Sequence, residues 1–276
     1  MQKSHARWQL PAIFWPSYHP PQRPSPSDIK HFAEVFTGLS RDSRVLLLGV
    51  TPEVRALATA RASSVVAVDA SLPMIKSVYS KADAPSDAWS SAVQASWDHL
   101  PFKDASFDAV LGDGVCVFSG SASFNSSRLA YWARFLKPGR GVLAVRVFER
   151  PCLPQPLLQM DDIVKLADSN CLNLDELRWQ LAYELADENG QVPLSLFYEE
   201  LVGTGFIDWL ARRFDEAELS KFLNYRGSPG TYWFPTREEF ISSAASCESL
   251  RLNSTRTASD YPLAQYCPVY SFHRLG

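Results

Sequence analysis

Several features that would assign a protein to a special class are scarce in this sequence. Its 276 residues include 5 cysteines, scattered singly at positions 116, 152, 171, 247 and 267. An odd number without any C-x-x-C pair argues against a disulfide framework and against a structural zinc site, and it suits a reducing compartment. We therefore expect no metal centre.

An excess of charge of one sign is missing as well. The chain has 27 lysines and arginines against 30 aspartates and glutamates, a formal net charge of −3. This balance creates no overall field that would gather nucleic acid or anionic lipid, so a nucleic-acid partner is disfavoured. No signal-peptide pattern is present, and no apolar run approaches the roughly 18–20 residues that span a bilayer. We expect a cytoplasmic protein without a membrane partner.

Hydrophobic residues, by contrast, make up 46% of the chain, which is enough for a sizeable core. Short apolar runs without period-two alternation follow one another in the first half, as is typical of parallel strands covered on both faces. The expected strands are 44–48, 64–68, 107–111 and 141–148, with helices at 52–60, 72–80 and 123–136. The pattern predicts an α/β fold with a doubly wound, mostly parallel sheet.

Changes in this pattern divide the chain into four segments. We expect residues 1–43 to form an N-terminal arm and a capping helix, and residues 44–150 to form the core of the fold. Residues 151–235 have helical apolar spacing and should form a helical insertion that acts as a lid. Residues 236–276 should supply the last helix and two closing strands, at 250–258 and 266–274.

Helix starts can be located from capping patterns. The first 27 residues are rich in proline and aromatic residues, which predicts an arm across the body and no regular helix. Ser25 and Asp28 then form a capping-box pattern that predicts a helix to about Gly38. Thr236 and Glu239 repeat the pattern before a later helix.

The first expected strand runs into the turn VLLLGVTPE at residues 45–53, where Gly49 is the only glycine. Gly49 lets the backbone approach a ligand closely, Thr51 can cap the next helix, and Pro52 fits its first position. The amides and the dipole of that helix would then point at an anion. A plain strand-to-helix connection with good capping residues would have the same sequence.

Asp69 ends the second expected strand, 20 residues after Gly49. A carboxylate at this distance can accept hydrogen bonds from both hydroxyls of an adenosine ribose. Alternatively it caps the next helix, although Ser71 can serve as that cap and leave Asp69 for a ligand.

Two further stretches complete a family resemblance. Residues 96–110, SWDHLPFKDASFDAV, and residues 135–145, FLKPGRGVLAV, follow VLLLG and VVAVDASLPMI in the chain. In this order the four stretches resemble class I S-adenosylmethionine-dependent methyltransferases, well over residues 44–148 and weakly over the final strands. The resemblance implies a Rossmann-like sheet of seven strands and S-adenosylmethionine as the cofactor.

The resemblance also implies which residues contact the cofactor. These are Gly49, Val50 and Thr51 at the methionine part, Asp69 at the ribose, and Ala70, Met74, Ser96 and Trp97 at the adenine. Ser96 stands where the family usually has an acid. Leu47 likewise replaces the acid that commonly helps to hold the methionine amino group, and we expect Asp113 to supply that charge instead. Arg23 is a candidate partner for the cofactor's carboxylate, as is the helix start after Thr51.

The sequence names no catalytic residue, because methyl transfer from a sulfonium is an in-line displacement that depends on alignment and on the exclusion of water. We expect a small-molecule or peptide acceptor, in a pocket that includes Tyr18, Arg146, Tyr198, Tyr232 and Trp233. The glycine-poor turn keeps a second reading open, a catalytically inactive, methyltransferase-like binding or regulatory protein. A nicotinamide-dependent dehydrogenase is a third, because it would share the opening turn and the ribose acid.

Overall fold

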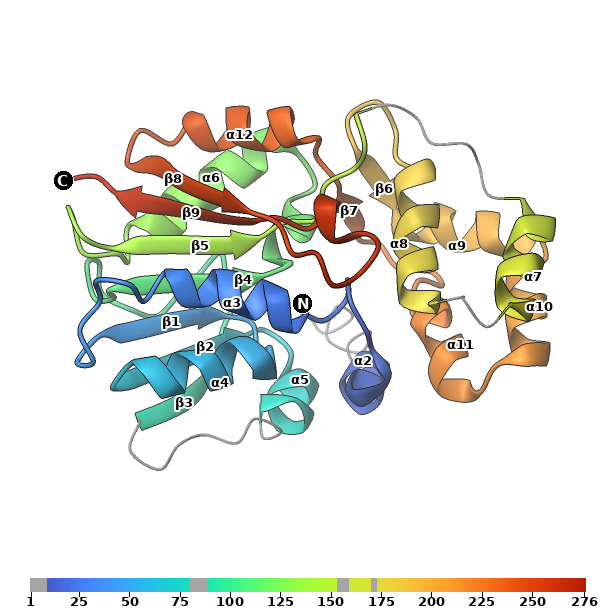
Figure 1. The fold of residues 1–276 in the computed structure, drawn as a ribbon, viewed down its shortest axis with the longest axis horizontal. Helices are drawn as coiled ribbons and strands as arrows, with labels where there is room; N and C mark the ends of the chain where they lie inside the picture. Colours follow the sequence, from blue (N-terminus) through green and yellow to red (C-terminus); the bar gives the residue numbers. More distant parts are fainter. Residues whose placement is uncertain (1–8, 80–88, 153–158, 170–172) are drawn as a thin grey trace.

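The computed structural model describes residues 9–79, 89–152, 159–169 and 173–276. Within these residues the centre of the fold is a seven-stranded sheet in the order β3-β2-β1-β4-β5-β9-β8, drawn in Figure 1. Its strands are β1 (Arg44–Leu48), β2 (Ser64–Asp69), β3 (Trp89–Gln94), β4 (Ala109–Asp113), β5 (Val142–Arg146), β8 (Leu250–Arg256) and β9 (Val269–Arg274).

The strands from β3 to β5 are parallel, whereas β9 is antiparallel to both β5 and β8. The chain begins in the middle of the sheet with β1, moves outward to β3, and returns to place β4 on the other side of β1. The strand order therefore reverses between β1 and β4, the point at which open parallel sheets form a crevice at the carboxyl ends of the strands. The predicted fold class is confirmed.

Alternate residues of β1 pack against opposite layers of helices. Leu46 and Leu48 belong to one hydrophobic cluster, and Val45 and Leu47 belong to another. All four side chains are fully buried, which explains why the strand sequence lacks period-two alternation. The helices of the first layer are α6 (Ala122–Ala133) and α12 (Arg237–Ala245), and those of the second are α3 (Pro26–Glu34), α4 (Pro52–Arg61) and α5 (Leu72–Ser77).

Capping residues start three of these helices where the sequence predicts. Ser25 with Asp28 forms the capping box of α3, and Thr236 with Glu239 forms that of α12. Ser71 caps α5. In each case a side-chain oxygen satisfies a backbone amide that has no partner within the helix.

Other boundaries differ from the prediction. Helix α3 ends at Glu34 and not near Gly38, because the following amides bond to carbonyls three residues back and tighten the chain into turns. Strand β4 begins at Ala109 because Phe107 pairs with Leu136 instead. Strand β3 was not predicted, since this partly buried edge strand, WSSAVQ, has few of the large apolar residues that mark the others.

The N-terminal arm contains a helix, although its proline content predicts none. Helix α2 (Gln9–Phe14) and the short 3-10 helix η1 (Trp15–Ser17) precede the chain that leads to α3. Pro11 is compatible with α2 because it lies in the first turn, where a backbone amide has no helical partner. The prediction of no helix in this segment is wrong.

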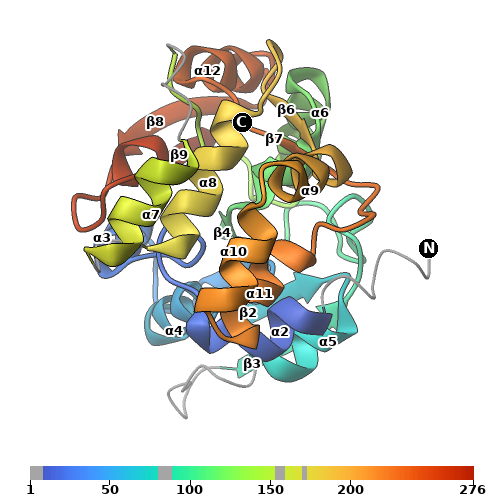
Figure 2. The ribbon, with the colours of Figure 1, turned by 90° about the vertical axis from the view of Figure 1, so that its right-hand side faces the viewer.

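A separate group of elements lies beyond the carboxyl ends of the parallel strands, as Figures 1 and 2 show. We call it the helical layer, and it has its own hydrophobic cluster. None of the helices in the described residues is both long and apolar enough to cross a membrane. The helical layer consists of α7 (Met160–Asp168), α8 (Leu174–Glu184), α9 (Leu194–Gly203), α10 (Phe206–Arg213), α11 (Glu216–Leu223), and a small sheet of β6 (Gln191–Pro193) and β7 (Thr231–Trp233).

Candidate functional site

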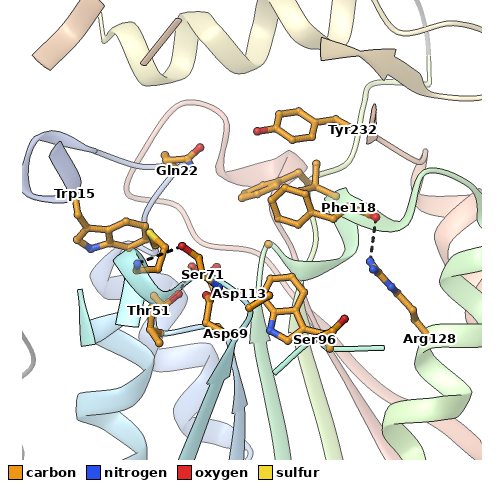
Figure 3. A pocket seen from close by; sticks show the side chains of 18 of the residues that line it. Trp15, Gln22, Thr51, Asp69, Ser71, Ser96, Asp113, Phe118, Arg128 and Tyr232 are labelled. Carbon is orange, nitrogen blue, oxygen red and sulfur yellow. Dashed lines mark hydrogen bonds between the residues drawn. The ribbon is translucent and has the colours of Figure 1, made fainter. Parts of the chain in front are cut away.

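A cavity opens at the carboxyl ends of β1, β2 and β4, where the strand order reverses (Figure 3). The strand ends form one side of it, and residues of the arm and of the helical layer form the other. Among the described residues it is lined by Trp15, Gln22, Gly49, Val50, Thr51, Asp69, Ala70, Ser71, Met74, Ser96, Trp97, Asp113, Gly114, Val117, Phe118, Arg128, Phe148, Trp179 and Tyr232. All the predicted cofactor residues except Arg23 are among them.

Gly49 follows β1 and has a φ of +91°, a conformation that L side chains rarely adopt. Its amide donates a hydrogen bond to the carbonyl of Val68 at 2.8 Å, which holds the turn against β2. The Trp97 ring lies beside this glycine, 3.7 Å from the place that a Cβ would occupy. The single glycine that the turn keeps is thus at the position whose backbone conformation requires it.

Thr51 lies at the start of α4 but does not cap it, so the predicted role of its side chain is wrong. Its hydroxyl instead donates to Asp113 Oδ2 at 3.5 Å, a long bond that links the β1 turn to the end of β4. Pro52 occupies the first helical position as expected. The first turn of α4 therefore has no side-chain cap from this residue.

Asp69 ends β2 and lines the cavity. One carboxylate oxygen, Oδ1, accepts the amide of Ser71 at 2.7 Å, and Ser71 in turn caps α5. Burial raises the pKa of the Asp69 carboxyl to about 6, and the hydrogen bond from Ser71 opposes this shift only in part. A ligand that donates hydrogen bonds to the ionised carboxylate would favour loss of the proton.

Ser96 lines the cavity, and its hydroxyl oxygen accepts the amide of Asp98 at 3.2 Å within the loop. The carboxylate of this loop belongs to Asp98, which Arg128 binds through two nitrogens at 2.7 and 2.9 Å. Arg128 also donates to the carbonyl of Phe118 at 3.0 Å, as Figure 3 shows. Both charges of this pair are therefore compensated within the protein.

Trp97 forms part of the cavity wall next to Ser96. Its indole N–H donates to the carbonyl of Val68 at 2.8 Å, and its own carbonyl accepts from Trp132 at 3.0 Å. These two bonds fix the ring between β2 and α6, which leaves only its apolar surface for a ligand.

Asp113 ends β4 beside a buried arginine. Arg146 of β5 donates to Asp113 Oδ1 at 2.6 Å and to Asp28 Oδ2 at 3.1 Å, and it also binds the carbonyl of Pro21 at 2.9 Å. Burial raises the pKa of the Asp113 carboxyl, while the Arg146 guanidinium opposes that shift. With both carboxyls ionised, two carboxylates and one guanidinium give this cluster one net negative charge.

Several predicted site residues lie elsewhere. Arg146 is completely buried behind Asp113, so its assignment to the substrate pocket is wrong. Arg23 pairs with Glu53 on α4 and does not line the cavity, so it is already neutralised. Tyr18 is buried in the arm beneath Arg178, whose guanidinium carbon lies 5.3 Å from the ring centre.

Of the three remaining aromatic predictions for the pocket, Tyr232 lines the cavity, whereas Tyr198 and Trp233 do not. Tyr198 of α9 packs at the edge of the cluster within the helical layer, outside the cavity lining. Trp233 is 2% exposed and belongs to the hydrophobic cluster between the sheet and the layer of α6 and α12, whereas its neighbour Tyr232 lines the cavity. Successive side chains of strand β7 point to opposite sides, so only one of the pair can face the cavity.

Some lining residues have no signal in the sequence that we recognised. Gly114 follows Asp113 with a φ of +64°, and a Cβ there would lie 2.7 Å from the Phe148 ring. The composition of the first 27 residues predicts an arm across the body, but it does not single out Trp15 and Gln22 as the arm residues that line the cavity. The others come from the helical layer or from turns, and they are Val117, Phe118, Phe148 and Trp179.

Comparison with known proteins agrees with this geometry. Residues 48–145 match the family model described as "Methyltransferase domain". A sequence search of curated proteins found no match. Among the described residues, no group of three or more potential metal ligands lies close together.

Solved structures share the fold over almost the whole chain. A protein from Rhodobacter sphaeroides named as a Zn-dependent alcohol dehydrogenase is 17% identical, with a TM-score of 0.62 and coverage of 99% of this chain and 98% of that one. The CcbJ methyltransferase from Streptomyces caelestis is 14% identical, with a TM-score of 0.59 and coverage of 98% of both chains. A SAM-dependent methyltransferase from Methanosarcina mazei is 16% identical, with a TM-score of 0.53 and coverage of 92% and 99%.

At such identities these structures establish the fold and nothing about substrates. The family match covers residues 48–145, from the end of β1 into β5, and this part of the chain forms the side of the cavity made by the strand ends. The recognition made from the sequence is confirmed: residues 48–145 match a methyltransferase domain, and the chain has the fold of SAM-dependent methyltransferases of known structure.

Proposed function

We propose that this chain is an active methyltransferase that moves a methyl group from S-adenosylmethionine to a small molecule held beneath the helical layer. The observation that carries the proposal is the pair of carboxylates, Asp69 and Asp113, at the ends of β2 and β4 in one cavity. They occur on either side of Gly49, the turn at which the strand order reverses.

The residues present fit the two polar ends of the cofactor. Asp69 would accept hydrogen bonds from the ribose hydroxyls, with Ala70 and Met74 beside the adenine. Asp113 belongs to a buried cluster with one net negative charge, which suits the methionine ammonium group. Leu47, which replaces the usual acid, is fully buried in the cluster that packs against α3, α4 and α5. Asp113 would therefore take over the role of that acid.

The cofactor's carboxylate would bind at the start of α4, whose first turn has no side-chain cap from Thr51. Arg23 is a weaker candidate for this role than the sequence suggests, because Glu53 already neutralises it. The ion pair with Glu53 holds the Arg23 side chain beside the first turn of α4, where it can still help to fix the position of that turn.

The rest of the chain would align the acceptor and exclude water. Bound S-adenosylmethionine supplies an electrophilic methyl group, so the protein has to provide position more than acid or base. Trp15 and Gln22 from the arm and Trp179 and Tyr232 from the helical layer form the far side of the cavity. We propose residues 151–235 as the lid and a small molecule as the acceptor, since the arm and the helical layer line the side of the cavity opposite the strand ends.

Calorimetric titration of the protein with S-adenosylhomocysteine tests this proposal most directly. We expect binding to the wild-type chain, at least tenfold weaker binding to Asp69→Ala, and unchanged binding to Asp104→Asn, an exposed carboxylate paired with Arg134. A matching thermal-shift series should show about 2.7 kcal/mol of stabilisation at one hundred times Kd. No response to this ligand or to S-adenosylmethionine would refute the enzyme and favour an inactive binding protein, while a response to nicotinamide dinucleotides alone would favour a dehydrogenase.

A further inference from the structure

Five aromatic rings form a continuous arch along the cavity, from the end of β5, through the helical layer, to the loop after β3. Each ring lines the cavity and contacts the next. Figure 3 shows two of them, Phe118 and Tyr232, across the cavity from Thr51, Asp69 and Ser96. The rings of this aromatic arch are, in order, Phe148, Trp179, Tyr232, Phe118 and Trp97, with successive centroids 4.6, 5.7, 5.6 and 6.0 Å apart.

Both ends of the aromatic arch rest on the turns proposed to hold the cofactor. A Cβ on Gly114, next to Asp113, would lie 2.7 Å from Phe148 at one end, and a Cβ on Gly49 would lie 3.7 Å from Trp97 at the other. Gly49 and Gly114 follow the neighbouring strands β1 and β4. The arch therefore encloses the space directly next to the methionine side of the cofactor site.

Each charged group that lines the cavity already has a partner in the protein or a proposed role in holding the cofactor. Arg128 is bound to Asp98, and Asp113 is bound to Arg146. Asp69 lies at the end of β2, outside the arch, where it accepts the Ser71 amide. Within the described lining, the arch brings no carboxylate, imidazole or amine to the acceptor, and its only ionisable group is the phenol of Tyr232.

This composition discriminates between kinds of methyl acceptor. A phenol or an alcohol needs a base to remove its proton, and a carboxylate needs a free cation to bind it, but the arch supplies neither. A neutral amine needs no base, because its lone pair is already available. Apolar surroundings favour the neutral amine over the ammonium ion in the reactant, and the faces of aromatic rings attract a cation once it forms.

We infer that the aromatic arch binds a small amine, and that the protein is an N-methyltransferase whose product is a tertiary or quaternary ammonium ion; this inference rests on the proposed function. The nitrogen lone pair forms the new N–C bond as the methyl C–S bond breaks, and the electron pair of that bond stays on sulfur. Positive charge moves from sulfur to nitrogen without leaving the arch. An amine that still carries hydrogen then releases a proton to water.

A set of probes with one aromatic ring tests the acceptor class. N,N-dimethylbenzylamine, 4-methylphenol and phenylacetate are each incubated with the protein and S-adenosylmethionine, and products are identified by mass spectrometry. We expect methylation of the amine alone, with a rate that follows the fraction of neutral amine as the pH rises. Methylation of the phenol or of the carboxylate in preference to the amine would overturn the inference.

Binding provides a readout that is independent of turnover. With S-adenosylhomocysteine bound, benzyltrimethylammonium should bind at least tenfold more tightly than neopentylbenzene, its uncharged isostere, as measured by quenching of tryptophan fluorescence. Phe118→Leu keeps an apolar side chain but removes a ring of the arch, so it should weaken binding of the cation about three- to tenfold. Phe102→Leu is the matched control, because Phe102 packs against the core cluster outside the cavity, and it should change nothing.

The two proposals fail in different ways. If S-adenosylhomocysteine does not bind, the proposed function is wrong and the acceptor assignment falls with it. If it binds but the cation and its isostere bind equally, or Phe118→Leu has no more effect than Phe102→Leu, the methyltransferase stands and only the amine assignment is wrong.

Discussion

The sheet domain and the helical layer each bury a cluster of charged side chains, and the two clusters differ in their net charge. In the sheet domain, Arg146 faces both Asp28 and Asp113, so one negative charge is left. In the helical layer, Asp175 pairs with Arg178 and Lys221, and Lys221 also reaches Glu218 at 2.8 Å. The second cluster is balanced within the protein.

The balanced cluster holds the arm in place. Lys221 donates to the carbonyl of Ser17 at 2.9 Å, the amide of His19 donates to Asp175 at 2.8 Å, and Arg178 donates to Gln22 at 2.8 Å. These bonds cross from α8 and α11 to the segment that carries Trp15 and Gln22 into the cavity.

The difference indicates separate purposes. An uncompensated buried charge is costly, and the cost is accepted where a ligand of opposite charge completes the site. The cluster of the sheet domain borders the cavity through Asp113, whereas the cluster of the helical layer serves the architecture. Substitutions in the two clusters should therefore differ in their effects on stability and on ligand binding.

Removing the arginine of the first cluster should have the largest effect. Arg146→Met leaves two buried carboxylates without their shared partner, and we expect the free energy of unfolding to fall by about 3–5 kcal/mol. Lys221→Met should cost less, because Asp175 keeps Arg178 and the amide of His19. Denaturant titration of both variants measures the difference, and equal losses would show that the two clusters are energetically alike.

Removing one carboxylate from each cluster should separate binding from stability. Asp113→Asn cancels the net negative charge at the cavity, and we expect at least about tenfold weaker binding of S-adenosylhomocysteine. Asp175→Asn should lower stability but leave affinity within about twofold, because its partners lie away from the proposed cofactor end. Calorimetry on the folded variants decides, and similar losses of affinity would contradict the assignment.

The pH dependence of cofactor binding should report on Asp69. Its pKa is raised by burial from 3.8 to about 6, so its contribution to the stability of the unliganded protein is complete below 3.8 and is lost as the pH rises to about 6. Ribose hydroxyls need the ionised form, so affinity should run in the opposite direction and fall about tenfold between about pH 7.5 and pH 5. In Asp69→Asn, titrated by the same method, this fall should disappear while affinity stays low at every pH.

A solvent-exposed ion pair should give the smallest change in the free energy of unfolding. Arg134 and Asp104 are more than half exposed, at 57% and 59% of their side chains, and lie 3.2 Å apart. Asp104→Asn should change the free energy of unfolding by less than about 0.5 kcal/mol, because solvent and salt screen such a pair. A loss comparable with that of Lys221→Met would mean that burial is not what distinguishes the clusters.

Much of the sheet domain could be predicted because its signals are local. The buried runs of β1 and β2, the capping boxes at Ser25 and Thr236, and the carboxylate at the end of β2 depend on a few consecutive residues. The edge strand β3 was missed for the same reason, since its partly buried serines carry no strong local signal.

The site was predictable on its cofactor side and much less so on its acceptor side. The end of each parallel strand is fixed once the fold is known, so Gly49, Asp69 and Asp113 could be placed together from the sequence. Arg146 has the same kind of position, at the end of β5, but its direction depends on two carboxylates far away in the sequence. The aromatic arch likewise joins residues from five different segments.

The doubly wound sheet, most helix starts and the strand-end carboxylates follow from local patterns, because hydrophobic periodicity and capping act between residues a few positions apart. Which charges are compensated and which rings face the cavity follows from long-range packing. Those outcomes depend on contacts such as Asp28 with Arg146, 118 positions apart, and on packing that selects one of two neighbouring side chains, as it does for Tyr232 and Trp233.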